Sequence, residues 1–282
     1  MTTVLDVQRF KDEARRFAVL TAYDFLSARI LDEAGIPVLL VGDSLGMVML
    51  GYPTTLPVTV EDMLVHARAV SRGSRQALLV GDMPFMSYQV STEHAIANAG
   101  RFIQEAGMHA VKLEGGGPVI EITRRLTEIG IPVMGHLGLT PQSVHTMGGF
   151  KVQGKTDAQA ARITADARAL EQAGAFSLVL EGVPSKLAVD ITRALRIPTI
   201  GIGAGPGTDA QVLVLHDMLG LTSGKAPKFV KRYANLAEDI ARAATAYADD
   251  VREGKFPGPE HEYSANGSAP SKDREEVRYG AG

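Results

Sequence analysis

The chain has 282 residues, of which 45% are hydrophobic and 22% charged, with a formal net charge of -3. This is the composition of a globular protein long enough for one large α/β domain, and the near-neutral charge argues against a nucleic-acid-binding face. No apolar run approaches the roughly 20 residues of a membrane span, and the absence of cysteine excludes disulfides, thiolate catalysis and Cys-based metal sites.

Apolar runs that resemble strands recur along the whole chain. Seven lie at residues 17–22, 38–42, 77–81, 110–113, 133–137, 177–180 and 199–202, and an eighth is expected at 212–215. They are apolar throughout rather than alternating, as in strands buried on both faces of a parallel sheet. Helical patterns separate them, at residues 59–71, 92–106, 120–129, 157–173 and 185–195.

A recurring sequence pattern marks the helix ends. A glycine follows each of four helical patterns, and an apolar run begins a few residues later; these are Gly35, Gly107, Gly130 and Gly174. Glycine at this position adopts the left-handed conformation that closes the last helical turn.

Eight such β-α units in about 250 residues predict an α/β fold, a closed (β/α)₈ TIM barrel. An open doubly wound sheet is the alternative, but no Gly-x-Gly-x-x-Gly motif follows the first strand. Residues 225–253 are expected to form one or two terminal helices. We therefore expect a single barrel domain with C-terminal helices over residues 1–263. The polar tail, residues 264–282, has too few apolar residues to pack and is expected to be disordered.

Four carboxylates end apolar runs, namely Asp43, Asp82, Glu114 and Glu181. Because barrel active sites lie at the carboxyl ends of the strands, these acids are expected to converge, and a hard cation would balance their charge. For Asp43 and Asp82, the alternative is an ordinary turn or helix-cap acid.

Lys112 and Glu114 are two residues apart, so both point to the same side of their strand. A lysine inside an apolar strand needs an anion, which is either a substrate or Glu114 itself in a structural ion pair. Glu181 is a candidate general base, with a metal ligand or helix N-terminal acid as the alternative. His136 is equally compatible with substrate contact and with a satisfied core position.

Two further segments carry weak signals. The glycine-rich stretch at 201–207 lacks a P-loop lysine, so it indicates either phosphate binding or simply a close backbone approach. The basic cluster at 225–233 is typical of a solvated, amphipathic helix start. The first ten residues lack a secretory pattern, and a cytoplasmic enzyme is expected.

A series of short motifs runs along the chain from about residue 10 to 262. They are Leu20-Thr-Ala-Tyr-Asp24, Val41-Gly-Asp-Ser44, Gly81-Asp-Met-Pro-Phe85, Val111-Lys-Leu-Glu-Gly-Gly116, Gly135-His-Leu-Gly-Leu-Thr-Pro-Gln-Ser-Val144, Gly148-Gly-Phe-Lys-Val-Gln-Gly154, Leu180-Glu181 with Val183-Pro184, Ile200-Gly-Ile-Gly-Ala-Gly205 and Pro227-Lys-Phe-Val-Lys231. With these motifs in family order, the chain resembles the ketopantoate hydroxymethyltransferase family.

The resemblance implies a barrel of the phosphoenolpyruvate mutase/isocitrate lyase superfamily. It also implies magnesium-dependent transfer of a one-carbon unit from the co-substrate 5,10-methylenetetrahydrofolate to 3-methyl-2-oxobutanoate. Asp43, Asp82 and Glu114 then correspond to the magnesium ligands, Asp43, Ser44, Asp82 and Lys112 to the keto-acid site, and Glu181 to the proton acceptor. A homo-oligomer, by resemblance a decamer, is expected, with no nucleic-acid or membrane partner.

A metal-dependent carbon–carbon lyase or mutase acting on a 2-keto acid is the nearest enzymatic alternative. Lyases of this group usually carry a cysteine on a catalytic loop, and this chain has none. A non-catalytic keto-acid-binding protein is the alternative from another class, and the presence of Glu181 argues against it.

Overall fold

Eight parallel strands close into a barrel in which every strand pairs with its neighbours in chain order and β8 pairs with β1. The strands are β1 Phe17–Thr21, β2 Val38–Val41, β3 Leu78–Asp82, β4 Ala110–Glu114, β5 Val133–Gly138, β6 Ser177–Glu181, β7 Thr199–Ile202 and β8 Ala210–Leu213. The closed order confirms the predicted (β/α)₈ barrel and rules out the open doubly wound sheet.

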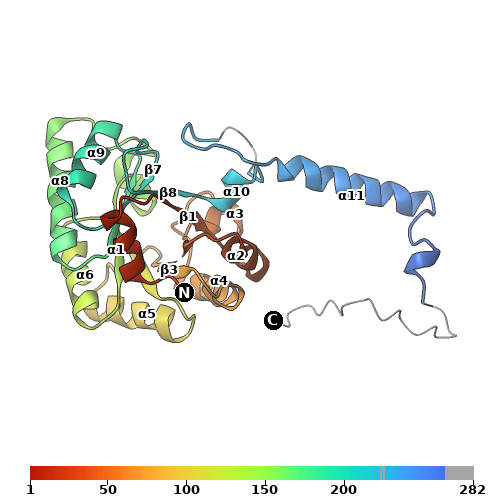
Figure 1. The fold of residues 1–282 in the computed structure, drawn as a ribbon, viewed down its shortest axis with the longest axis horizontal. Coiled ribbons are helices and arrows are strands. Elements are labelled where there is room, and N and C mark those ends of the chain that lie inside the picture. Colours follow the sequence, from red (N-terminus) through yellow and green to blue (C-terminus); the bar gives the residue numbers. More distant parts are fainter. Residues whose placement is uncertain (223, 225, 264–282) are drawn as a thin grey trace. The chain divides into compact units, whose positions relative to one another are not determined.

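The computed structural model describes residues 1–222, 224 and 226–263 (Figure 1). The chain divides into two compact units, one covering Met1–Ala234 and a second that begins at Asn235. The predicted disordered tail, residues 264–282, lies outside the described residues. The single-domain organisation expected for residues 1–263 stays a prediction.

Helices α2, α4, α5, α6, α8 and α9 lie around the outside of the strands (Figure 1). Their bounds are α2 Phe25–Glu33, α4 Val60–Gly73, α5 Thr92–Gln104, α6 Pro118–Glu128, α8 Asp157–Gln172 and α9 Ser185–Ala194. Threonine or serine side chains cap the N-termini of α4, α5 and α8. The four helix-end glycines named above all have φ between +69° and +95°, which confirms the predicted left-handed terminations.

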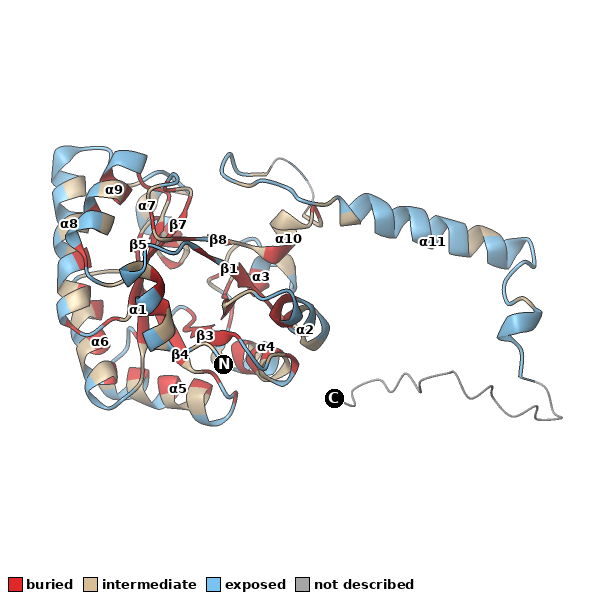
Figure 2. Cartoon of the chain, viewed as in Figure 1, coloured by how far each residue is buried: buried red, intermediate tan, exposed pale blue. Residues whose placement is uncertain are grey.

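Buried residues, red in Figure 2, gather on the barrel strands and on parts of the helices around them. Inward-facing residues such as Val19, Leu40 and Ile200 fill the barrel, while two outer clusters lie between the strands and the surrounding helices. Burial on both faces accounts for the continuous apolar runs.

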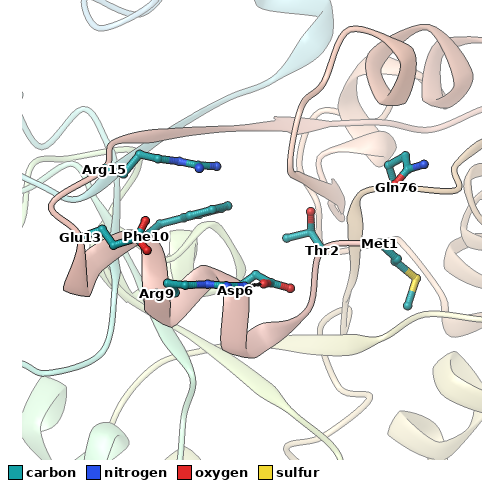
Figure 3. A pocket seen from close by; sticks show the side chains of 8 residues that line it. All are labelled: Met1, Thr2, Asp6, Arg9, Phe10, Glu13, Arg15 and Gln76. Carbon is teal, nitrogen blue, oxygen red and sulfur yellow. Dashed lines mark hydrogen bonds and ion pairs between the residues drawn. The ribbon is translucent and has the colours of Figure 1, made fainter.

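Helix α1, Val4–Asp12, was not predicted, and it covers the amino-terminal end of the barrel. Its Val7 and Phe10 are buried in the same cluster as Phe17 and Ala210, which begin β1 and β8. An open pocket of about 450 Å³ lies beside α1, where the Arg15 guanidinium stacks 4.0 Å above the Phe10 ring (Figure 3). This pocket is at the opposite end of the barrel from the predicted acids.

Two predicted boundaries were wrong. Strand β8 begins at Ala210, not residue 212, because Ala210 pairs with Phe17 and is buried in the barrel. Residues 226–235 form no helix, because the Tyr233 N–H donates to the Met218 carbonyl at 2.8 Å and holds the segment against the barrel. The basic cluster is therefore not a helix start.

The remaining helices are short, apart from α11. Helix α3 spans Leu45–Val48, η1 Pro141–Ser143, α7 Val144–Met147 and α10 Leu215–Met218. The second unit contains α11, Leu236–Arg252, which has no buried residue, and η2, Pro259–His261. Within the described residues, no helix is both long enough and apolar enough to cross a bilayer.

Candidate active site

The predicted site residues meet at the carboxyl end of the barrel. Asp82, Glu114 and Glu181 are the last residues of β3, β4 and β6, while Asp43 follows β2 by two positions. One cavity of about 790 Å³ is lined by all of the predicted site residues and by His136, that is by Asp43, Ser44, Asp82, Lys112, Glu114, His136 and Glu181. The predicted convergence of the acids is therefore confirmed.

Lys112 lies at the centre of the charged groups. Strand register places it beside Asp82, and its Nζ donates to both Asp82 carboxylate oxygens at 2.7 Å. The same Nζ lies 3.3 Å from Glu114 Oε1. The ion pair foreseen between Lys112 and Glu114 thus exists, but Asp82 is the closer partner, and all three side chains are buried.

Three carboxylates form a cluster with the composition of a metal site. One oxygen from each of Asp43, Asp82 and Glu114 can be chosen so that the three atoms lie within 4.8 Å of one another. Hard cations prefer such oxygen donors. Asp43 caps no helix, since Ser44 occupies the N-cap position of α3 and makes no side-chain cap bond.

The electrostatics of this cluster favour a cation. Burial raises the pKa of Asp43 well above its usual value of 3.8, and the charges of Asp82 and Glu114 raise it further. Burial likewise raises the pKa of Asp82, although Lys112 opposes the shift. Without a further positive charge, these acids are therefore held toward the protonated form. The donor set fits a divalent metal ion, whose charge would stabilise both carboxylates.

Glu114 has the opposite shift. Burial acts to raise its pKa, but the positive charges of Lys112 and His136 outweigh that effect and lower the pKa to about 2. The pKa of Lys112 is raised. Burial acts to lower it, but the charges of Asp82 and Glu114 outweigh burial. Glu114 and Lys112 are thus held as a charged pair.

His136 links Glu114 to Glu181. Its Nδ1 lies 3.3 Å from Glu114 Oε1 and its Nε2 lies 3.3 Å from Glu181 Oε2, although neither N–H is aligned as a good hydrogen bond. Burial acts to lower its pKa, but Glu114 more than compensates and raises the pKa to about 9. Glu181 is the most exposed of the four carboxylates, with 16% of its side chain accessible. His136, whose role was left open from the sequence, therefore belongs to the site.

Sequence reasoning missed a buried bridge made by Gln142. Its Nε2 donates to Asp43 Oδ2 at 3.0 Å and to the Met83 carbonyl at 2.9 Å, and its backbone N–H donates to Glu114 Oε2 at 3.1 Å. The Tyr88 hydroxyl donates to Gln142 Oε1 at 2.7 Å. Gln142 lies in a stretch that carried the family resemblance, whereas nothing distinguished Tyr88 from an ordinary core tyrosine.

Two other predicted features lie in the cavity wall. The Ser44 hydroxyl is 2.9 Å from the Tyr23 hydroxyl and faces the cavity. Gly203 and Gly205, from the glycine-rich stretch after β7, also line it. A Cβ on Gly205 would lie 2.3 Å from Ser185 Oγ, so close backbone approach explains this glycine.

Comparison with known proteins identifies the family. The profile of the ketopantoate hydroxymethyltransferase family matches residues 1–259. The chain is 58% identical over 262 residues to a 3-methyl-2-oxobutanoate hydroxymethyltransferase of Syntrophotalea carbinolica, covering 93% of this chain and 98% of that protein. It is 59% identical over 257 residues to the protein of the same name from Syntrophus aciditrophicus, covering 91% and 94%.

Solved structures of much lower identity share the fold. A phosphonopyruvate hydrolase in complex with oxalate and Mg²⁺ has a TM-score of 0.60 at 13% identity, covering 94% of this chain and 93% of that chain. A 2,3-dimethylmalate lyase, a member of the PEP mutase/isocitrate lyase superfamily, has a TM-score of 0.59 at 19% identity, covering 94% and 92%. With the family match above, these comparisons confirm the predicted resemblance: the chain belongs to the ketopantoate hydroxymethyltransferase family.

Proposed function

We propose that this protein transfers a hydroxymethyl group from 5,10-methylenetetrahydrofolate to 3-methyl-2-oxobutanoate, giving 2-dehydropantoate, the first step of pantothenate biosynthesis. The observation that carries the proposal is the convergence, in one cavity of a family member, of a carboxylate cluster, a buried lysine and a fourth carboxylate.

Asp43, Asp82 and Glu114 would hold magnesium, one ion per subunit. When bound, the ion supplies Lewis acidity that polarises the keto acid and acidifies its C3 hydrogen. Asp43, Ser44, Asp82 and Lys112 bind and orient the keto acid. The Lys112 ammonium, buried and fixed by Asp82, stabilises negative charge that develops on the substrate oxygen.

Glu181 accepts the C3 proton. It lies on β6, apart from the Lys112–Asp82 pair, and His136 Nε2 lies 3.3 Å from its Oε2. Its greater exposure leaves it able to exchange the proton with solvent after each turnover.

The C3–H bond breaks and its proton passes to Glu181. Water opens the methylene bridge of the folate: both carbon–nitrogen bonds break, each nitrogen takes up one water proton, tetrahydrofolate leaves, and the carbon is released with the water oxygen at the oxidation level of formaldehyde. C3 then forms a bond to that carbon, the carbonyl electron pair passes to its oxygen, and a proton, matching the one that Glu181 releases, completes the hydroxyl.

The lyase or mutase alternative has no specific support in this site. Similar solved structures with lyase or mutase names are 13–19% identical to this chain, and they establish the fold only. The expected decamer and cytoplasmic location stay predictions.

Product formation tests the proposal directly. The protein, 3-methyl-2-oxobutanoate and methylenetetrahydrofolate are incubated with magnesium or with EDTA, and products are identified by mass spectrometry. We expect a magnesium-dependent gain of one hydroxymethyl group. Absence of product from well-folded protein, with turnover of a lyase substrate instead, would reverse the assignment.

A further inference from the structure

The mouth of the catalytic cavity exposes an unusual group of apolar side chains. Four of those that line the cavity are 40–54% exposed: Met47 at 40%, Phe150 at 54%, Val152 at 45% and Phe229 at 40%. Single exposed apolar residues are ordinary, whereas a group at one pocket indicates a ligand surface. We call these four residues the apolar rim.

The rim is assembled from three distant parts of the chain. Met47 belongs to α3 after β2, Phe150 and Val152 follow α7, and Phe229 lies in the turn closed by the Val230 N–H and the Pro227 carbonyl at 3.0 Å. The Phe229 ring rests on Gly203, where φ is +61° and an added Cβ would lie 2.9 Å from Phe229 Cδ1. The glycine thus leaves room for a ring facing the cavity.

Two lysines accompany the apolar rim. Lys151 lies between Phe150 and Val152, Lys228 precedes Phe229, and both line the same cavity. Among the residues that the structure describes, neither forms an ion pair. Asp217 also lines the cavity and accepts a hydrogen bond from the Thr222 hydroxyl at 2.8 Å. The mouth therefore offers apolar faces, two ammonium groups and one carboxylate.

The size of the cavity leaves space beyond the keto acid. At about 790 Å³, it lies in the upper part of the range that encloses drug-sized ligands. The keto acid, bound as proposed above, would occupy only the part beside the acid cluster. A reduced folate has a flat pteridine and an aminobenzoyl ring, amino and ring N–H donors, and one or more glutamyl carboxylates. Its rings match the apolar rim, its donors match Asp217, and its carboxylates match the lysines.

We propose that the apolar rim is the subsite for the aromatic body of the folate co-substrate, and that Lys151 and Lys228 bind its glutamyl carboxylates. The inference rests on the proposed function, because it places the one-carbon donor of that reaction beside the keto-acid site. Neither lysine touches the reacting atoms, so both act in binding alone.

Separate kinetic readouts for the two substrates test the subsite. Exchange of the keto-acid C3 hydrogen with D₂O, followed by NMR, requires keto acid, magnesium and base but no folate. For Phe150→Ala and Phe229→Ala, we expect the KM for methylenetetrahydrofolate to rise roughly tenfold while the exchange rate changes less than about twofold. Lys151→Ala with Lys228→Ala should raise that KM by a factor of about five, and more strongly for polyglutamylated folate.

Matched variants control for general effects on the surface. Tyr233→Ala removes an exposed aromatic four positions from Phe229, and Lys155→Ala and Lys231→Ala remove nearby lysines, none of which lines the cavity. These variants should leave the folate KM unchanged. An unchanged folate KM in all the rim and lysine variants, with normal exchange, would overturn the subsite and leave the proposed function standing.

A direct measurement of tetrahydrofolate binding tests the subsite if the protein proves inactive. If the wild-type protein shows neither exchange nor product, the proposed function fails, and calorimetric titration with tetrahydrofolate then tests the subsite alone. Tetrahydrofolate binding that weakens in the rim variants supports the subsite, whereas equal binding, or none to the wild type, contradicts it.

Discussion

Glu181 differs from the other three carboxylates of the cavity in its surroundings. Asp82 and Glu114 contact Lys112, and Asp43 accepts a hydrogen bond from Gln142, whereas Glu181 lies 3.3 Å from His136 and keeps 16% of its side chain accessible. A base must release the proton that it takes, and a carboxylate fixed by an ammonium does this poorly. Of the four acids, Glu181 therefore suits proton transfer best.

For Glu181→Gln, we expect magnesium-dependent keto-acid binding to persist while C3 exchange and turnover fall by at least about 100-fold. The amide keeps the shape of the side chain but accepts no proton. Calorimetry measures binding and NMR measures exchange. Glu121→Gln, at an exposed acid of α6, serves as the control. Exchange close to the wild-type rate in Glu181→Gln would remove Glu181 from the role of base.

Gln142 illustrates a positioning role that no short motif reveals. Both of its amide hydrogens and its carbonyl oxygen are used, and its contacts tie Asp43 to Met83 and Tyr88. A leucine of similar size would leave Asp43 without this donor, so the carboxylate would be less well fixed before the ion binds.

For Gln142→Leu, we expect magnesium affinity, measured by calorimetry without substrate, to fall about 10- to 100-fold. Gln89→Leu is the matched control, because Gln89 donates to Gln142 Oε1 at 3.2 Å and, among the described residues, forms no hydrogen bond with a carboxylate. Equal magnesium affinity in wild type and Gln142→Leu would show that Gln142 serves packing alone.

At the scale of elements, Asp32 shows how one helix end organises a loop. The carboxylate is at the end of α2 and accepts hydrogen bonds from Ser74 Oγ at 2.6 Å and from the N–H groups of Arg75, Gln76 and Ala77 at 2.8–3.2 Å. Burial acts to raise the pKa of Asp32, but these four donors together outweigh it and lower the pKa below the usual 3.8. The loop from α4 to β3 is thereby fixed, and with it the strand that ends in Asp82.

For Asp32→Ala, we expect the free energy of unfolding in urea at pH 7 to fall by about 1–3 kcal/mol, because the loop donors lose their acceptor. Glu33→Ala, at the exposed neighbour, should have little effect. The folded-state pKa of Asp32 is depressed, so its contribution is present in full above the unfolded pKa of about 3.9 and is lost as pH falls through the folded value. The difference between wild type and Asp32→Ala should therefore be constant from pH 7 to pH 5 and shrink below about pH 4. A difference that grew on acidification would contradict this account.

Elements differed in how far the sequence predicted them. Strands buried on both faces gave continuous apolar runs, and glycines marked the ends of the helices between them, so the barrel and its acidic carboxyl ends were predictable. Helix α1 was missed because only two of its residues, Val7 and Phe10, are buried. The prediction of a helix at residues 226–235 was wrong. There the Tyr233 N–H donates to the Met218 carbonyl instead of to a carbonyl within a helix, and local sequence patterns do not reveal such a tertiary hydrogen bond.

At the scale of the whole molecule, the two ends of the barrel have separate tasks. Helix α1 covers the amino-terminal end, where its buried Val7 and Phe10 contribute to stability. The carboxylates of the predicted metal site gather at the carboxyl end. The charge assembly opposes folding when no ion is present, because burial raises the pKa of Asp43 and Asp82 and so disfavours their charged forms. An ion bound to the folded protein alone would offset that cost.

We therefore expect magnesium to raise the thermal midpoint of the whole protein. At a concentration 100 times its dissociation constant, a single ion contributes about 2.7 kcal/mol, which corresponds to roughly 5–10 °C for a chain of this size. Because burial and the neighbouring charges raise the pKa of Asp43, a proton competes with the ion for this carboxylate, so the shift should be larger at pH 8 than at pH 5. Differential scanning calorimetry at constant ionic strength measures both effects, and Asp82→Asn should abolish most of the shift. A midpoint that does not respond to magnesium at either pH, or that responds equally in Asp82→Asn, would mean that this acidic cluster is balanced by Lys112 and His136 without a metal ion.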